Sequence, residues 1–230
     1  MEQAEYEEKL KKRQEKEAKT GKKVRGHALR PPQAGPQDKD QVNFTDEESR
    51  IVLSSEGFVR AYNEQAAVDI DSYLIVENHL TQQSNDKQEV EPTLKGLKGN
   101  EAVLGKAEGL LADAGYFSAD NVAHCEDAQM TPYISDHRER HNLAWDERFK
   151  VPPPCPKEAD AVTTMAHRLR TCEGKAISAW RRSTVETVFG IVKEVMGFRR
   201  FHLRGFDAAQ GEWNLVCMAW NMKRMYTLAG

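Results

Sequence analysis

The spacing of apolar and polar positions divides the chain into two regions. Residues 1–23 are dense in charged, helix-forming residues and nearly free of apolar ones, so a helix there has no hydrophobic stripe to bury. Residues 24–42 are rich in proline and glycine, as linkers are. Apolar runs begin after that. The pattern therefore predicts a charged helical arm and a Pro/Gly linker over residues 1–42, followed by a folded region over residues 43–230.

Short strands are predicted in the first half of the folded region. Two β-rich runs, about Val59–Val68 and Tyr73–Leu80, flank the sequence DIDS and predict a β-hairpin. The apolar run in GLLADAGYFS predicts a strand that ends at Asp113. The sequence TPYISD (131–136) predicts one more short strand.

Helices are predicted between these strands and throughout the last third of the chain. Ser84 or Asn85 can cap a first helix, and a short helix is expected near residues 118–126. Apolar periodicity predicts three more helices over about residues 160–169, 174–196 and 208–225. Strands with helices between them, followed by helices alone, indicate a mixed α/β domain rather than a doubly wound repeat.

The long helix of residues 174–196 has two faces of interest. Val185, Val188, Phe189, Val192 and Met196 form its buried stripe. Arg182, Glu186 and Lys193 share a neighbouring face at spacings of four and seven residues. Two cations on the same face would hold the glutamate ionised. The alternative is a plain surface ion pair between Arg182 and Glu186, and the spacing alone favours that alternative.

Composition restricts the class of protein. Charged residues make up 30% of the chain and the mean hydropathy is -0.71, which is typical of a polar, soluble protein. The sequence has no apolar run long enough to cross a bilayer and no secretory signal, so we expect no membrane association and a cytoplasmic location. The four cysteines form no CxxC pair and are expected to be free thiols.

Charge is distributed unevenly along the chain. Residues 166–230 contain eleven Lys and Arg residues and five acids, whereas the whole chain has a formal net charge of -3. A basic C-terminal quarter on an acidic protein is a candidate surface for binding a polyanion such as DNA. Ordinary solvated helix faces would produce the same composition, and charge alone does not separate the two interpretations.

Asp113 also has two interpretations. An aspartate directly after a strand often caps the following turn, and the sequence Asp-Ala-Gly favours a turn. Strand ends in α/β proteins also present side chains to a ligand crevice. Taken alone, Asp113 is more simply explained as a turn cap.

Several motifs occur together and in a fixed order: YNEQAAVD, SND, ADAGY, VETVFGIVKEVMGFRRFHLRG and EWNLVCMAWNMKRM. This series resembles the C-terminal part of DDE transposases of bacterial insertion sequences, and the resemblance covers about residues 43–226. It implies a ribonuclease-H-like fold, with a central mixed sheet and helices on both sides. It also implies three carboxylates, Asp, Asp and Glu, that hold Mg²⁺ or Mn²⁺ for cutting and joining DNA.

The motifs assign roles to individual residues through this resemblance. Asp113 in ADAGY corresponds to the second acid, and Glu186 in VETVFG corresponds to the third, so both are expected to be catalytic metal ligands. A related signature places Arg182 and Lys193 around that glutamate, although Ala179 stands where the signature has tyrosine. DNA-backbone contacts are expected from four basic residues: Arg182, Lys193, Arg199 and Arg200.

The first acid of the family has no clear counterpart in this sequence. In the family it lies on an opening strand before the YNxQ hairpin, and no apolar strand ending in aspartate precedes that hairpin here. Asp46, Asp69, Asp71 and Asp86 do not fit the position, and Asp46 is the weakest substitute. The resemblance therefore implies the C-terminal part of a catalytic domain that lacks its first strand and its first metal ligand.

These expectations lead to one preferred function and two alternatives. The preferred one is a fragment of a metal-dependent transposase, an enzyme for DNA cleavage and strand transfer. The fragment is expected to be inactive alone. Its expected partners are insertion-sequence DNA and further copies of the chain. For a two-metal site, the carboxyl carbons of Asp113 and Glu186 should lie within roughly 10 Å. The alternatives are a DNA-binding or oligomerising remnant without catalysis, and a structural protein whose acids are helix caps and surface pairs.

Overall fold

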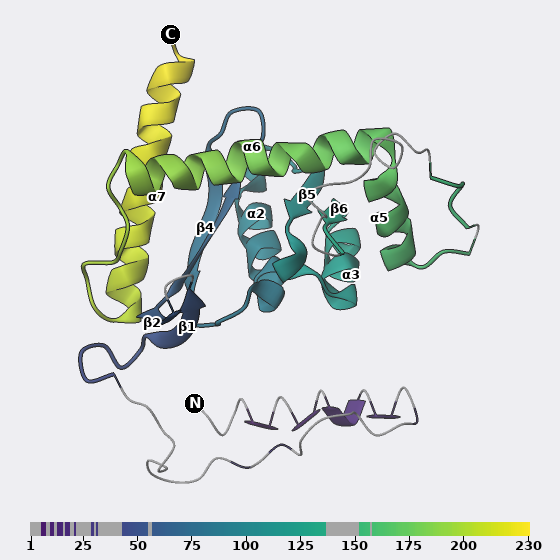
Figure 1. Ribbon diagram of the computed structural model, residues 1–230, viewed down its shortest axis with the longest axis horizontal. Coiled ribbons are helices and arrows are strands. Elements are labelled where there is room, and N and C mark those ends of the chain that lie inside the picture. The colour runs from purple at the N-terminus through teal and green to yellow at the C-terminus, as the bar shows by residue number, and fades with distance from the viewer. Residues whose placement is uncertain are drawn as a thin grey trace. The chain divides into compact units, whose positions relative to one another are not determined.

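The structure is a computed structural model, and it divides the chain into two compact units, Met1–Val42 and Asn43–Gly230 (Figure 1). In the first unit only scattered positions are described; those between residues 6 and 18 are helical, and Arg13 Nε lies 3.6 Å from Glu17 Oε1. In the second unit the structure describes residues 43–54, 57–136, 152–156 and 158–230.

In the described part of the second unit, the strands form three separate two-stranded sheets. Two sheets are antiparallel and the third is parallel. Their strands are β1 (Arg50–Ser54) with β2 (Gly57–Ala61), β3 (Asn63–Val68) with β4 (Ile75–Thr81), and β5 (Gly109–Ala112) with β6 (Thr131–Ile134).

Helices follow the strands in the order that the apolar periodicity predicts. Two single-turn 3-10 helices precede longer ones: η1 (Asp86–Gln88) before α2 (Val90–Leu104), and η2 (Ala114–Tyr116) before α3 (Ala119–Asp127). The last third is helical, as expected, with α5 (Ala161–Arg170), α6 (Cys172–Glu194) and α7 (Phe206–Leu228). Ser118 caps α3 by accepting a hydrogen bond from the Asn121 N–H, and Asn85 caps η1 in the same way through Lys87.

The predicted hairpin is present, but its first strand is shorter than the sequence suggested. The run predicted over 59–68 is divided at Tyr62, where the chain leaves β2 and enters β3. Tyr62 is buried with Leu80 and Ala209, and its hydroxyl donates to both carboxylate oxygens of Asp46 at 2.8 and 2.9 Å. The chain thereby changes sheets at a buried side chain. The preceding strand, β1, was not predicted, and it ends at Ser54 rather than at an acid.

The two larger hydrophobic cores among the described residues join different sets of elements. One joins α2, α3, β6 and α5 through buried Val90, Leu94, Val122, Cys125, Met130, Ile134 and Met165. The other joins β4, α6 and α7 through buried Ile75, Val188, Val192, Trp213, Cys217 and Trp220. The stripe predicted for the long helix is therefore correct at its centre. Trp180 on α6 is 47% exposed and lies outside both cores.

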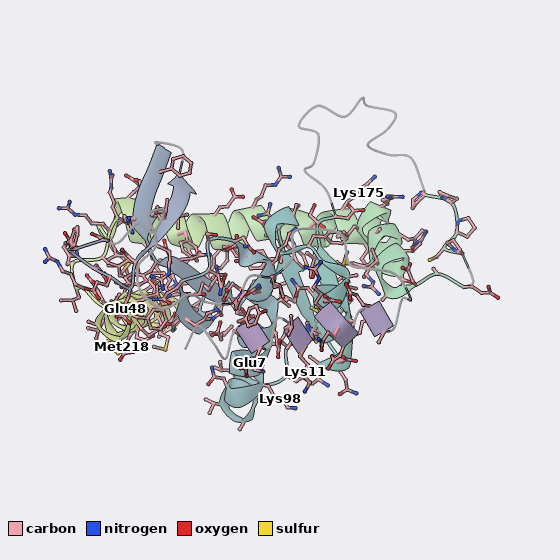
Figure 2. All side chains as sticks on the ribbon, turned by 90° about the horizontal axis from the view of Figure 1, so that it is seen from below. Glu7, Lys11, Glu48, Lys98, Lys175 and Met218 are labelled. Carbon is pink, nitrogen blue, oxygen red and sulfur yellow. The ribbon has the colours of Figure 1, made fainter. Side chains whose placement is uncertain are left out.

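Helix α6 connects the two halves of the domain. It runs from α5 to α7 and packs against both β3 and β5 (Figure 1). Lys175 marks its beginning near α5, whereas Met218 on α7 lies at the other end of the domain (Figure 2). The corner between α5 and α6 is tight: the Thr171 hydroxyl donates to the Arg168 carbonyl at 2.7 Å and accepts from the Gly174 N–H at 3.0 Å.

Helix α7 covers the outer edge of β4 with side chains. Asn221 exchanges two hydrogen bonds with the backbone of Ile75, both at 2.8 Å, and Gln210 accepts from the Leu80 N–H at 2.6 Å. The Trp213 indole donates to the Gln65 carbonyl at 3.0 Å. Gln210, and Asn221 from the EWNLVCMAWNMKRM motif, therefore satisfy an edge of β4 that would otherwise be unpaired.

The mixed α/β class is confirmed, but the single mixed sheet expected from the sequence is not present as one sheet. β3 and β5 belong to different two-stranded sheets and are not paired with each other. A cavity lies between them, and it is described below with the candidate site. Among the described residues, no helix combines the length and the apolar character needed to span a bilayer.

Candidate functional site

Asp113 lies where the sequence places it, immediately after β5. It is the N-cap of η2, and its Oδ1 accepts a hydrogen bond from the Gly115 N–H at 2.7 Å. The turn-cap interpretation is thus correct in part. The side chain is only partly buried and also lines the cavity between β3 and β5, so capping leaves Asp113 accessible to a ligand.

A second carboxylate, Asp86, lies beside Asp113. It begins η1, and its Oδ1 accepts from Asn63 Nδ2 at 2.8 Å and from Gln65 Nε2 at 3.0 Å. A side chain added at Gly115 would place its Cβ 2.9 Å from Asp113 Oδ1 and 3.3 Å from Asp86 Oδ2. Asp113 Oδ1 and Asp86 Oδ2 are therefore no farther apart than the sum of these two distances. One or two divalent cations can bridge such a span.

Tyr116 completes this polar cluster. Its hydroxyl donates a short hydrogen bond to Gln65 Oε1, so that Gln65 connects Tyr116 to Asp86. Burial raises the pKa of Tyr116 well above its usual value, and the negative charges of Asp86 and Asp113 raise it further. The phenol therefore stays a protonated donor at neutral pH. Residues from YNEQ, SND and ADAGY thus meet at one end of β5.

The expected third acid, Glu186, lies on α6 and is exposed. Its side chain is 59% accessible, and its Oε1 lies 3.8 Å from Arg181 Nη1. Arg181, Thr184 and Val185 line the cavity that Asp113 also lines, whereas Glu186 is not part of that lining. The sequence favoured Arg182 as the partner of Glu186; the structure pairs Glu186 with Arg181, and Arg182 is exposed on the same helix.

Lys193 points toward β3. Its Nζ lies 3.9 Å from Glu64 Oε1 and 5.6 Å from the centre of the Phe189 ring. Burial raises the pKa of Glu64, and the Lys193 charge offsets this only in part. The expected DNA-binding lysine is therefore half-exposed and held beside an acid.

The two expected arginines follow α6. Arg199 donates to the carboxylate of Glu194 and, at 3.4 Å, to the backbone carbonyl of Lys193, so it folds back onto the end of the helix. Arg200 is exposed. Together with Lys193 they form a basic end of α6.

The other acids considered as a first metal ligand have structural partners. Asp46 accepts from Tyr62 and from the Gly205 N–H at 3.3 Å; burial would raise its pKa, but these hydrogen bonds outweigh burial and lower it. Asp69 Oδ2 accepts from the Ser72 N–H inside the hairpin turn. Asp71 is exposed and lines the cavity.

A cavity of about 660 Å³ lies between β3 and β5. Backbone and side chains of residues 65–71 form one wall, and residues 104–113 form the opposite wall. Helices α2 and α6 also line the cavity, including Ile177 and the exposed Trp180 of α6. Asp113 and Tyr116 stand at one end of the cavity.

A second polar cluster lies on the same face of the hairpin as Gln65, because His79 is directly paired with Gln65. His79 lies between two buried acids, with Nδ1 3.0 Å from Glu77 Oε1 and Nε2 3.0 Å from Glu89 Oε2. Burial lowers the pKa of His79, but its hydrogen bonds to the two carboxylates outweigh burial and raise it to about 9. This cluster connects β4 to the beginning of α2.

The donor set at Asp113 fits a divalent cation such as Mg²⁺. No group of three His, Cys, Asp or Glu side chains gathers around one point within the described residues. Mg²⁺ nevertheless commonly binds one or two carboxylates and completes its shell with water and substrate phosphates. Asp86 and Asp113 supply two such carboxylates.

The comparison with protein families decides the affiliation. A family model described as the transposase DDE domain matches residues 49–222. The chain belongs to the DDE transposases. Comparisons with curated proteins and with solved structures give no match. The DDE domain includes the whole Asn63, Gln65, Asp86, Asp113 and Tyr116 cluster, whereas Asp46 lies outside the matched range.

Sequence reasoning assigned a role to Asp113 alone in this cluster. Asp86 was set aside because it precedes a helix rather than ending a strand, and Asn63, Gln65 and Tyr116 were given no role. The signal for these residues was their place in the motifs YNEQ, SND and ADAGY. A buried polar side chain such as Gln65 requires a hydrogen-bonding partner.

Proposed function

We propose that this DDE domain binds DNA and holds a divalent cation at Asp113, as part of the cleavage and strand-transfer site of a transposase with a ribonuclease-H-like fold. The observation that carries the proposal is the adjacency of Asp86 and Asp113 at the end of β5, inside the matched domain. Glu186 is proposed as the third acid of this site. Asp86 is proposed as a further ligand.

The residues around the metal position have separable roles in this proposal. When bound, Mg²⁺ or Mn²⁺ supplies an activated oxygen nucleophile and stabilises the leaving oxygen of a phosphodiester. Asn63 and Gln65 hold Asp86 by two hydrogen bonds, so one carboxylate oxygen stays directed toward Asp113. Arg182, Lys193, Arg199 and Arg200 bind phosphates of the DNA backbone.

Metal binding is testable without measuring cleavage. Adding Mn²⁺ to the full chain should broaden the amide NMR signals around Gly115 and Asp86 first, because the paramagnetic ion acts over short range. Asp113→Asn and Asp86→Asn should each reduce the broadening, since each removes a carboxylate ligand. Asp127→Asn, at the exposed end of α3, is the matched control and should leave it unchanged. Equal broadening in all variants would contradict the proposed ligands.

DNA binding should be weak, independent of sequence and steeply dependent on salt. Each phosphate contact contributes about 0.9 to the slope of log K against log salt, so Lys193→Ala and Arg182→Ala should each lower the slope by about 1. Lys98→Ala removes a lysine from α2, apart from α6 (Figure 2), and serves as the control. Fluorescence anisotropy with a labelled duplex measures these slopes. If Lys98→Ala lowered the salt slope as much as Lys193→Ala, the result would contradict a DNA-binding role for α6.

The isolated 230-residue chain should not nick supercoiled plasmid with Mg²⁺ or Mn²⁺. In the proposal, Asp86 adds a ligand but does not replace the first strand and first aspartate of the family. The acid set therefore stays incomplete for the two ions that cleavage uses. Metal-dependent nicking that is lost in Asp113→Ala and in Glu186→Ala would show that the acid set is complete. The alternative of a non-catalytic DNA-binding or oligomerising remnant predicts DNA binding without the Mn²⁺ effect.

A further inference from the structure

Helix α7 has an inner and an outer face. The inner face packs into the domain through four buried side chains: Ala209, Trp213, Cys217 and Trp220. The outer face is apolar and at least half exposed at five side chains: Leu215, Met218, Met222, Met225 and Tyr226. The last turns of α7 also project beyond α6 (Figure 1). Large apolar side chains gathered on one exposed face are typical of an interaction surface.

The spacing on the outer face is that of a coiled coil. Steps of three, four and three residues separate the members of the α7 seam, which are Leu215, Met218, Met222 and Met225. These are the a and d positions of a heptad repeat, which keep an apolar seam turned toward a second helix. Gly211 and Ala229 continue the repeat with small residues, four positions to either side. The α7 seam therefore fits another helix lying along it.

The charges of α7 favour a second copy of the same helix in the antiparallel direction. The first half of α7 contains Asp207 and Glu212. The second half contains Lys223, at the edge of the α7 seam, and Arg224, which also donates to the Ser72 carbonyl. Two parallel copies would align like charges, whereas antiparallel copies place the acidic half of each beside the basic half of the other. The antiparallel direction also brings opposite ends of the two helix dipoles together.

Pairing each a position with a d position of the other copy fixes the register. Leu215 then faces Met225 of the second copy, and Met218 faces Met222 of the second copy. The two-fold axis passes beside Ala219, and its small side chain lets the two helices approach closely. Because the same surface is used twice, the contact is isologous and closes after two copies.

A cavity of about 280 Å³ lies beside the α7 seam. Its lining includes Met196 and Phe198, which are apolar, and His202 and Glu212, which are polar. His202 Nδ1 lies 2.9 Å from Glu212 Oε1. Burial would raise the pKa of Glu212, but hydrogen bonds from the Leu203 and His202 N–H groups outweigh burial and lower it. Glu212 is therefore an ionised acceptor in the wall of an otherwise largely apolar cavity.

Tyr226 of the second copy is the side chain that reaches this cavity. Glu212 and Tyr226 lie seven residues before and seven residues after Ala219, so the antiparallel register places them opposite each other. Tyr226 is 83% exposed in the single chain. A tyrosine has an apolar ring that suits the apolar walls and a hydroxyl that can donate to a carboxylate.

We propose that α7 forms a homodimer interface: two copies of the chain pair their α7 seams antiparallel, and each inserts Tyr226 into the cavity beside Glu212 of the other. The occupant is a second copy because the direction, the register and the cavity all match α7 itself. The proposal assigns a surface, a direction and a register, none of which follows from the family. It depends on neither DNA binding nor metal binding.

Sedimentation equilibrium of the full chain tests the interface. Over roughly 1–200 µM protein, the mass should rise from one chain to two. Met222→Glu should weaken association at least tenfold, because each copy would bury a charge in the α7 seam. Tyr226→Ala should weaken it at least tenfold by removing an aromatic anchor. Both residues are exposed in the single chain, so circular dichroism should show unchanged folding. Val103→Glu, at an 87% exposed position on α2, is the matched control and should leave association unchanged.

Mixing two variants tests the direction. Met218→Lys and Met222→Glu should each be monomeric alone, whereas an equimolar mixture should form a heterodimer. Antiparallel pairing places position 218 of one copy against position 222 of the other, so the two introduced charges attract each other. Parallel pairing would place each introduced charge against a methionine, and the mixture would stay monomeric.

Three outcomes would overturn the proposal. A natural chain that stays monomeric over the whole concentration range would assign the outer face of α7 to another occupant. A dimer that Met222→Glu and Tyr226→Ala leave intact would use another surface. A mixture of the two charged variants that does not associate would rule out the antiparallel register.

Discussion

Gly174→Ala should destabilise the folded domain by about 3 kcal/mol or more. A Cβ at Gly174 would lie 1.9 Å from the carbonyl oxygen of Arg168 and 3.0 Å from Cα of Leu169. Both are backbone atoms of α5, so no side-chain rotation can relieve the overlap. The α5–α6 corner would have to open, which would disturb the packing of α5 in the core around Met165.

Gly190→Ala on the same helix is the matched control. A Cβ there meets nothing within 4 Å, and alanine is favoured over glycine in a helix by about 1 kcal/mol, so this variant should be slightly more stable. Urea unfolding followed by circular dichroism measures both changes. Similar midpoints for the two variants would mean that the corner is not as tight as the Gly174 contacts indicate.

Raising the pH from 6.5 to 9 should lower the free energy of unfolding through His79. The pKa of this histidine is raised to about 9 in the folded state, against 6.5 for an unperturbed side chain. The unfolded state loses the proton first, so the stability provided by the charged imidazole is complete below pH 6.5 and decreases as pH approaches and passes 9. The full loss amounts to about 3 kcal/mol, since one pKa unit corresponds to 1.36 kcal/mol.

His79→Gln isolates this contribution. Glutamine can still donate to one of the two glutamates but has no charge to lose, so the decrease between pH 6.5 and 9 should be absent from its unfolding free energies. At pH 6 the variant should be less stable than the natural chain, because Glu77 and Glu89 remain buried without a cation between them. Parallel pH profiles for the two proteins would place the titrating group elsewhere.

The helices and the hairpin were predictable because local periodicity encodes them. The stripe at Val188 and Val192 is buried, as a 3.6-residue spacing requires, and Ser118 and Asn85 cap where their side chains suggest. The change of sheets at Tyr62 was not predictable in this way. It depends on Asp46 and Ala209, which are distant in sequence and leave no periodic signal in β2 or β3.

The site was predictable only as far as single motifs allow. Asp113 follows a strand in the sequence and in the structure. Its proximity to Asp86 arises from the fold, because Asn63 and Gln65 of β3 fix Asp86 across the end of β5. The partner of Glu186 was also missed: helical spacing allows both Arg181 and Arg182 to approach it, and side-chain direction selects between them. That the carboxyl carbons of Asp113 and Glu186 lie within roughly 10 Å of each other stays a prediction.

The way in which α7 covers β4 has a consequence for synthesis of the chain. The contacts of Asn221 with Ile75 and of Trp213 with Gln65 join residues 146 and 148 positions apart. At 5–20 residues per second, a ribosome needs roughly 7 to 30 s to make that intervening length. During this time the β3–β4 hairpin has left the ribosome, but α7 does not yet cover the outer edge of β4. Early folding of α2, β5, α3 and β6, which contact one another locally, therefore precedes closure of that edge, and the nascent chain is most exposed to wrong pairing before α7 arrives.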